Sequence, residues 1–152
     1  TNEYTPGKAL NLGVNQSSGD LIMIISAHCE ISDFSLDSAI EGLKNNIAIY
    51  GKQIPIWDGK KISRRYMWSN FGDKSDTNIF CESENRYFFH NGFSLFKKDS
   101  LLDFPFDEEL SGKEDRVWAN NVIEKNHTIK YDASLVVKHH YTIHGATWKG
   151  TG

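Results

Sequence analysis

The chain has 152 residues and a formal net charge of −3, and 39% of its residues are hydrophobic and 12% aromatic. This composition is that of one globular domain with its own core, and it excludes an intrinsically disordered chain. The slightly acidic balance argues against a nucleic-acid-binding protein, which needs a basic surface.

The sequence contains no apolar run long enough to cross a membrane and no signal-peptide pattern at its start. Its two cysteines, Cys29 and Cys81, do not have Cys-x-x-Cys spacing. We therefore predict free thiols in a reducing compartment, with a disulfide between them as the less favoured alternative.

The first two predicted elements are a helix and a strand. Leu10 and Val14 stand four residues apart and predict a short amphipathic helix over residues 8–18. The apolar run LIMII then predicts a strand over residues 21–26 that is buried on both faces, as in a parallel sheet.

The elements that follow extend the same alternation. A second helix is expected over residues 34–45, and then a strand over 46–56 that Pro55 ends. The alternation of helix and strand favours an α/β fold. A parallel strand at 21–26 needs a neighbour, and nothing before it supplies one. We therefore expect a single domain over residues 1–152 that lacks the N-terminal part of its fold.

The second half of the chain contains one long helix and several short strands. Ser111 and Glu114 have the spacing of a capping box at the start of a helix over 111–126. Gly92 interrupts a strand-like stretch over 86–97, which indicates a bulge or a close approach to the backbone. The other expected elements are a basic and aromatic helix over 60–70, a helical turn over 99–103, strands over 128–131 and 135–139, and a flexible tail over 142–152. The basic face of the helix over 60–70 is expected to be solvated, and the alternative is that it pairs with phosphate.

Polar residues follow directly after the apolar strand at 21–26. In open α/β sheets, ligands bind at the carboxyl ends of the strands. The neutral imidazole of His28 and the carboxylate of Glu30 lie at such an end and are suited to a divalent cation. On spacing alone, a polar surface histidine is the favoured alternative.

Two adjacent carboxylates, Glu114 and Asp115, stand at the start of the predicted helix over 111–126. The capping box accounts for Glu114, but it does not account for Asp115. A carboxylate held at a helix start is a candidate general base toward a hydroxyl. The alternative is an exposed aspartate that complements the helix dipole.

Two histidine-containing segments are further candidates. Successive strand residues point to opposite faces, so only one of His139 and His140 can serve a given site. In His90-Asn91-Gly92 the polar side chains can hydrogen-bond sugar hydroxyls while the glycine lets a substrate approach. The alternatives are two surface histidines and an interior bulge.

The order of these segments carries more information than any one of them. The stretches GKALNLGVNQSSGDLIMIISAH, YGKQIPI and FPFDEELSGKEDRVWANNVIEKNHTIKYDASLVVKHH resemble the bacterial family-two glycosyltransferases of the GT-A fold. The resemblance implies an α/β, GT-A-like mixed sheet flanked by helices. It also implies that the N-terminal nucleotide-binding βαβ unit of that fold is missing.

The resemblance assigns roles to particular residues. In that family an Asp-x-Asp-type motif grips the metal and the donor diphosphate, and here Ser26-Ala27-His28 occupies its place. The matches imply His28 and His139 as metal ligands and Asp115, in the pair Glu114-Asp115, as the catalytic base. The remaining implied residues are Lys8, Asn11, Ser26 and Glu30 on the donor side and His90, Asn91 and Gly92 on the acceptor side.

The function that the resemblance implies is that of an inverting glycosyltransferase. It would move a sugar from a nucleotide-diphosphate donor to a hydroxyl of a saccharide or lipid-linked acceptor, with Mn²⁺ or Mg²⁺, in surface polysaccharide or glycan synthesis. The expected location is the cytoplasm; peripheral association with the inner face of the membrane and a homo-oligomer both stay open. The alternative is a non-catalytic sugar- or nucleotide-binding module, or an inactive fragment of such an enzyme, and the missing aspartates favour it.

Overall fold

A computed structural model describes residues 4–61 and 72–141 of the chain. The predicted tail over 142–152 and most of the predicted helix over 60–70 lie outside these described residues. Lys60 and Lys61 are described, and they form a strand, not the start of a helix. None of the described helices is long and apolar enough to span a membrane.

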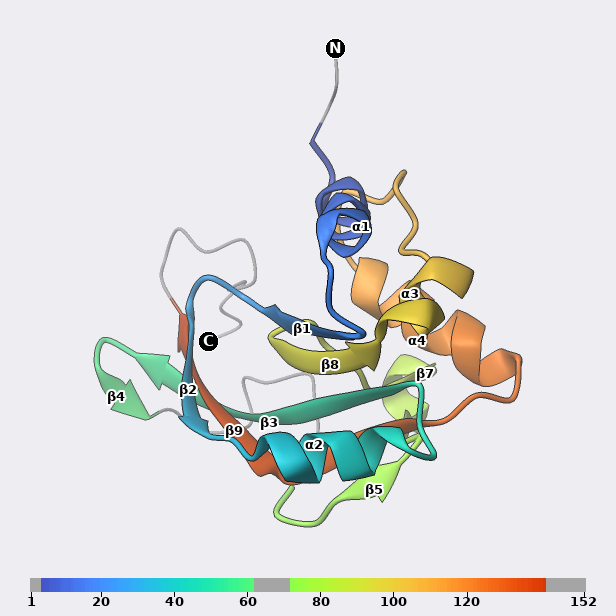
Figure 1. The fold of residues 1–152 in the computed structure, drawn as a ribbon. Helices are drawn as coiled ribbons and strands as arrows, with labels where there is room; N and C mark the ends of the chain where they lie inside the picture. Colours follow the sequence, from blue (N-terminus) through green and yellow to red (C-terminus); the bar gives the residue numbers. More distant parts are fainter. Residues whose placement is uncertain (1–3, 62–71, 142–152) are drawn as a thin grey trace.

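The two helices and two strands predicted over residues 8–56 are present, but a further strand over Cys29–Asp33, which was not predicted, lies between the first strand and the second helix (Figure 1). The helices are α1 (Pro6–Gln16), α2 (Leu36–Leu43), α3 (Lys98–Asp103) and α4 (Glu114–Glu124), with a short 3₁₀ helix, η2 (Glu82–Glu84). The strands are β1 (Leu21–Ile25), β2 (Cys29–Asp33), β3 (Ala48–Trp57), β4 (Lys60–Lys61), β5 (Asp76–Thr77), β6 (Phe80–Cys81), β7 (Arg86–Tyr87), β8 (Phe93–Lys97) and β9 (Ile129–Tyr141).

The main sheet is mixed and has the strand order β1-β8-β3-β9-β2. Strands β3 and β9 are parallel, whereas β8 is antiparallel to both β1 and β3, and β2 is antiparallel to β9. Strands β1, β3 and β9 therefore run in one direction, and β8 and β2 run in the other. This mixed α/β architecture confirms the predicted fold class.

The sheet is curled, because its two outer strands are consecutive in the chain. In a flat sheet four strand spacings would separate β1 from β2 by about 19 Å. Residues 26–28 are the whole link between these strands, and the chain from Ile25 to Cys29 reaches at most about 14 Å. The two edges must therefore approach one another, and Figure 1 shows the chain passing from β1 over the open end of the sheet to β2.

The prediction that β1 is buried on both faces is wrong. Strand β1 pairs only with β8 in the described sheet, and its residues alternate between exposed and partly buried. Leu21, Met23 and Ile25 are 37%, 40% and 39% exposed, while Ile22 and Ile24 pack against the core. The apolar run reflects an edge strand, not a central parallel strand.

Two later strand predictions were also wrong in detail. Strand β3 continues through Pro55 to Trp57, paired with β9 on one side. On its other side β8 pairs only with Ala48 to Tyr50 and β4 only with Ile56 and Trp57, so no described strand residue pairs with Pro55 there. The two strands expected over 128–131 and 135–139 are one strand, β9, with a register shift opposite Gly51.

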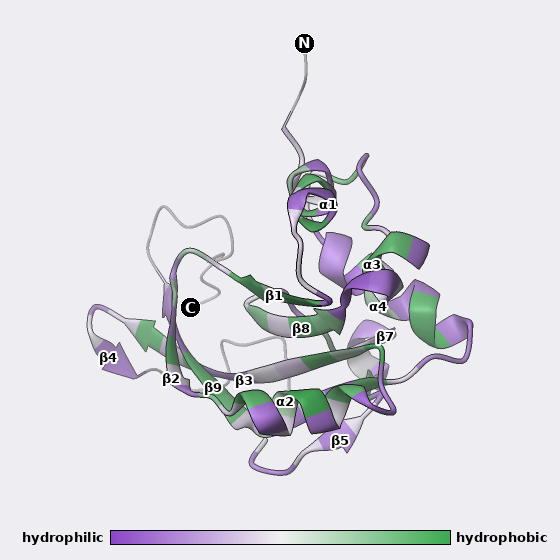
Figure 2. Cartoon of the chain, viewed as in Figure 1, coloured by the Kyte–Doolittle hydropathy of each residue, from purple (hydrophilic) through white to green (hydrophobic). Residues whose placement is uncertain are grey.

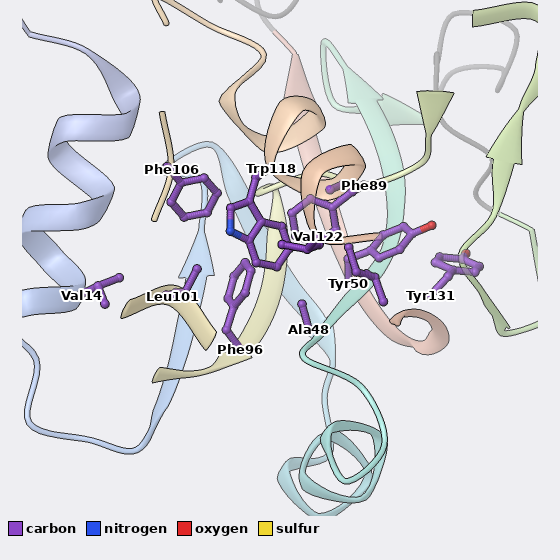
Figure 3. Packing of buried hydrophobic residues seen from close by; sticks show 12 residues of the cluster. Val14, Ala48, Tyr50, Phe89, Phe96, Leu101, Phe106, Trp118, Val122 and Tyr131 are labelled. Atoms are coloured by element: carbon purple, nitrogen blue, oxygen red, sulfur yellow. The ribbon is translucent and has the colours of Figure 1, made fainter. Parts of the chain in front are cut away.

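Two hydrophobic clusters cover the two faces of the sheet. On one face the aromatic residues Phe89, Phe96 and Phe106 surround Trp118 of α4, with ring centroids 5.2–5.8 Å from its ring (Figure 3). On the other face α2 packs Ala39 and Leu43 over the sheet. Figure 2 shows α2 alternating between hydrophobic and hydrophilic segments, as expected of a helix with one buried side.

Helix α4 starts differently from the prediction. It begins at Glu114 after Lys113, which has a left-handed backbone with φ of 67° and no side-chain cap. Ser111 lies two residues before that cap position, so the predicted capping box does not form. Both carboxylates, Glu114 and Asp115, still lie in the first turn of the helix.

Asn11 of α1 holds the loop that leads toward α4. Its side-chain amide donates to the carbonyl of Phe106 and to Glu108 Oε1, each at 2.9 Å, and its oxygen accepts from the amide of Phe106 at 3.0 Å. The helix comes so close to this loop that a Cβ on Gly7 would lie 2.2 Å from the carbonyl oxygen of Asp107. Asn11 therefore connects α1 to the segment before α4 by hydrogen bonds.

We expect Asn11→Ala to lower the free energy of unfolding by about 1–3 kcal/mol, because it leaves the buried N–H and C=O of Phe106 without partners. Urea denaturation measures this loss. The control is Asn15→Ala on the same helix, whose exposed side chain predicts a change within about 0.5 kcal/mol. Equal effects of the two substitutions would contradict this role for Asn11.

Candidate functional site

The polar segments singled out in the sequence meet at one rim of the sheet. The carboxyl ends of β1 and β9 lie at this rim with the amino ends of β8 and β2, because these two pairs of strands run in opposite directions. Ile25 at the end of β1 pairs with Phe93 at the start of β8, and Cys29 at the start of β2 pairs with His139 near the end of β9. The rim therefore collects residues 26–29, 90–92 and 139.

Hydrogen bonds join these segments to one another. The amide of Ser26 donates to the carbonyl of Gly92 at 3.2 Å, and its hydroxyl donates to the carbonyl of Asn91 at 3.3 Å. The amide of Asn91 in turn donates to the carboxylate of Asp115. The structure thus brings Ser26, Asn91, Gly92 and Asp115 together, although almost ninety residues separate the first from the last.

His28 and His139 are also neighbours. Their ring centroids lie 4.5 Å apart, and the amide of His140 donates to the carbonyl of His28 at 2.9 Å. His28 is exposed, whereas His139 is 6% exposed and stacks on Tyr141. The prediction that His139 and His140 face opposite sides is confirmed, because His140 is exposed and contacts Glu30.

The tautomer of His139 follows from its partner. Its Nδ1 is hydrogen-bonded to the side-chain oxygen of Gln53, and an amide oxygen only accepts, so Nδ1 carries the proton. The other ring nitrogen, Nε2, is buried and has no hydrogen-bond partner among the described residues. Burial, followed by the nearby His28, lowers the pKa of His139 to about 3. The imidazole is therefore neutral at pH 7 with its Nε2 lone pair available.

A divalent metal ion fits this arrangement. The ligand atoms of His28, Cys29 and His139 all lie within 4.8 Å of one another. A histidine that binds a metal through one nitrogen usually donates its other N–H to a carbonyl or carboxylate, as His139 does toward Gln53. Burial, followed by His140, also lowers the pKa of His28, which favours its neutral, metal-binding form.

The carboxylate of Asp115 has two backbone donors. The amide of Arg116 donates to it at 2.8 Å, in addition to the amide of Asn91. Burial is the largest influence and raises the pKa of Asp115 above its usual value. Burial, followed by the charge of Asp115, also raises the pKa of Glu114. A carboxylate with a raised pKa is a better proton acceptor toward a hydroxyl.

Glu30 does not lie with the candidate metal ligands. It is exposed, and its carboxylate binds Lys138 at 2.9 Å and His140 at 3.2 Å. Strand alternation places it on the face of β2 opposite to Cys29, which pairs with His139. Glu30 was expected to bind the donor beside His28, but its side chain lies on the other face of the strand from the candidate metal ligands.

His90 has a structural role in the fold. It is buried, its Nε2 is hydrogen-bonded to the carbonyl of Gly51 at 2.9 Å, and its Nδ1 accepts from the amide of Gly92 at 3.2 Å. Both ring nitrogens are thus engaged by the backbone, which leaves neither for an acceptor. Of the residues predicted on the donor side, Asn11 is engaged by the 106–108 loop, and Lys8 is exposed on the first turn of α1.

Asn91 differs from His90 in having an unused donor. Its side-chain oxygen accepts from Ser94 at 3.2 Å, but its buried Nδ2 has no partner among the described residues. Only three such buried atoms occur among those residues, and two of them, on Asn91 and His139, lie at this rim; the third is Tyr50 Oη. Because buried polar groups are normally hydrogen-bonded, this concentration makes the rim the candidate ligand site.

Two residues of the site were not predicted. Gln53 is a polar, 5% exposed residue within an apolar strand, and that exception in the pattern is the signal that could have identified it. Cys29 was interpreted only as a free thiol, and the pairing of β2 with β9 is what places it beside His139.

Buried histidines make the stability depend on pH. Burial lowers the pKa of His90 to about 4 and that of His139 to about 3, whereas in the unfolded chain both titrate near about 6.5. As the pH falls below that value, the unfolded chain binds protons that the folded chain does not. The free energy of unfolding then decreases by up to about 1.4 kcal/mol per pH unit for each histidine.

We expect His90→Gln to weaken this pH dependence, measured by urea denaturation between about pH 7 and about pH 5. Comparison with the unsubstituted chain isolates the histidine from Glu114 and Asp115, whose raised pKa values act in the opposite sense. An unchanged slope in the variant would show that His90 is not a buried neutral histidine.

Comparison with known proteins identifies the family. Residues 1–104 match the model of glycosyl transferase family 2. No curated protein matches the sequence. A solved structure, described as the crystal structure of GalNAc-T7 with UDP, GalNAc and Mn²⁺, is similar with a TM-score of 0.64 and 11% identity, over 93% of this chain and 31% of that one. The chain thus spans about a third of the length of that structure, and the likeness shows the GT-A fold alone. The expected family and fold are confirmed, and the chain belongs to glycosyl transferase family 2.

Proposed function

We propose that this chain carries the catalytic rim of an inverting glycosyltransferase that moves a sugar from a nucleotide-diphosphate donor to a hydroxyl acceptor. The observation that supports this most directly is the chain of hydrogen bonds from Asp115 through Asn91 to Ser26. It joins a candidate general base to the loop that bears His28. The solved structure of GalNAc-T7 contains UDP and Mn²⁺, which supports a nucleotide-diphosphate donor and a divalent metal here.

Asp115 is the proposed general base. It accepts the proton of the acceptor hydroxyl while the hydroxyl oxygen forms a bond to the anomeric carbon. The bond from that carbon to the diphosphate breaks on the opposite face, and the diphosphate leaves with the electron pair, so the configuration is inverted. The amides of Asn91 and Arg116 hold the carboxylate in place, and burial keeps its pKa above the usual value.

The other rim residues bind and orient. The unpartnered Nδ2 of Asn91 donates to an oxygen of the sugar or acceptor, and buried Gly92 provides the backbone next to it. A divalent cation held by His28 and His139 would neutralise the negative charge of the diphosphate. The acceptor class we propose is a saccharide or a lipid-linked sugar, as in surface polysaccharide or glycan synthesis.

A non-catalytic sugar- or nucleotide-binding module is the second candidate function. It is favoured by Ser26, which stands where the resemblance places a charged aspartate and whose hydroxyl is hydrogen-bonded to Asn91. In that case the protein binds a nucleotide-diphosphate sugar without turning it over. Measuring donor binding and donor turnover on the same preparation separates the two functions.

In the full-length protein we expect Asp115→Asn to lower turnover by about 10²–10⁴-fold, which is the usual contribution of a general base. An asparagine oxygen can still accept from the amides of Asn91 and Arg116, so donor affinity should change little. The measurements are sugar transfer to the acceptor and calorimetric binding of the donor.

The matched control is Asp103→Asn in α3, an exposed carboxylate outside the rim, which should leave turnover unchanged. Turnover of Asp115→Asn close to that of the unsubstituted protein would refute the role of Asp115. A matching loss in the Asp103 variant would show that the effect is not specific to the rim.

A further inference from the structure

We propose that Cys29 is a third ligand of the metal site formed with His28 and His139, and that this site binds Zn²⁺ and Co²⁺ in preference to Mn²⁺ and Mg²⁺. The inference rests on the proposed function for the role of the metal, but not for its binding. It departs from the expectation of Mn²⁺ or Mg²⁺ that the sequence resemblance carries.

The pairing of β2 with β9 places the thiol at the site. Cys29 lies directly opposite His139 in the antiparallel ladder, and directly opposed residues direct their side chains to the same face. The thiol and one nitrogen of each imidazole lie within 4.8 Å of one another. In the part of the chain that is described, this is the only such group of three metal-binding residue types.

Neither Ser26 nor Glu30 supplies a carboxylate to the site, as a hard cation would require. Ser26 has no charge, and its hydroxyl donates to the carbonyl of Asn91. Glu30 lies on the other face of β2, where it binds Lys138 and His140. Mg²⁺ and Mn²⁺ favour oxygen ligands such as carboxylates and waters, whereas thiolate and imidazole are the ligands of Zn²⁺. The available donors therefore match Zn²⁺ and Co²⁺.

His139 is arranged for binding before any metal arrives. Its Nε2 is buried without a partner, and its Nδ1–H is directed to Gln53. Gln53 is 5% exposed, and its amide nitrogen lies so close to Gly92 that an added Cβ there would come within 2.8 Å of it. The partner of His139 thus has little room to turn away. Removing such an outer hydrogen bond commonly lowers the metal affinity by about 10–100-fold.

Metal binding requires the three ligand atoms to move slightly closer together. Around a tetrahedral Zn²⁺ the ligand atoms stand about 3.3–3.6 Å apart, so the group must contract by roughly 1 Å from its present limit of 4.8 Å. The exposed side chain of His28 can supply this movement by rotation. Three protein ligands leave a fourth position for an oxygen of water or of a diphosphate, which is the pattern of catalytic rather than structural zinc sites.

The thiol exchanges its proton for the metal. Burial raises the pKa of Cys29 to about 12, so the free chain carries a neutral S–H. On binding, the sulfur–metal bond forms as the S–H bond breaks, and the proton goes to solvent. Nothing is oxidised or reduced in this step.

Cobalt absorption spectroscopy tests the proposal on the metal-free full chain without a histidine tag. Bound Co²⁺ should give the intense visible bands of a tetrahedral site and a near-ultraviolet sulfur-to-cobalt charge-transfer band. Zn²⁺ should remove both on an equimolar scale, whereas a large excess of Mn²⁺ or Mg²⁺ should not. Cys29→Ser should lose the charge-transfer band, and the control Cys81→Ser should keep it. Gln53→Leu should keep the band but bind Co²⁺ about 10–100-fold more weakly.

The outcomes separate this inference from the proposed function. Co²⁺ that binds without the charge-transfer band, or a band that persists in Cys29→Ser, overturns the role of Cys29 and leaves the metal site of the two histidines standing. Displacement of Zn²⁺ by Mn²⁺ overturns the metal preference. If no divalent metal binds, the metal site itself is refuted, while turnover and its loss in Asp115→Asn still test the transferase.

Discussion

The short link between β1 and β2 is the constraint on which the site depends. These two strands lie at opposite ends of the sheet, yet residues 26–28 are all that joins them. The sheet must curl for the link to close. The curl brings the β2–β9 pair, in which Cys29 lies across from His139, toward the β1–β8 pair. The same link is hydrogen-bonded to residues 91 and 92, which immediately precede β8. A flat sheet with the same strand order would leave these groups at separate edges.

Around this link, the polar side chains divide into those that support the site and those that face a ligand. His90 and Gln53 are buried and bond to the backbone and to His139, respectively. Asn91 and His139 each keep one buried atom without a partner in the described structure. Supporting residues of this kind hold ligand-binding groups in position, which lowers the cost of ordering them when a ligand binds.

The titratable groups of the rim belong to different elements of the fold. The raised-pKa carboxylate Asp115 belongs to the first turn of α4, whereas the neutral imidazoles belong to the β1–β2 link and to β9. The backbone of Asn91 connects the two elements, because its amide donates to Asp115 and its carbonyl accepts from Ser26 of the β1–β2 link. In the proposed function, the proton acceptor and the cation site can therefore each keep the protonation state they need, because their pKa values are set by different surroundings.

The sequence by itself determined the α/β class, the presence of helices α1, α2 and α4 and of strands β1 and β3, and the opposite orientations of His139 and His140. Periodicity and alternation, which indicate these features, are local properties of the chain. The family resemblance added the candidate roles of His28, Asp115 and His139. Only the tertiary structure decided which strands pair, and hence that β1 is an edge strand, that Glu30 faces away and that Cys29 lies beside His139. It also decided that His90 and Asn11 bond to distant backbone groups. Such contacts join residues tens of positions apart, and their register is set by the packing of the whole sheet rather than by any local pattern.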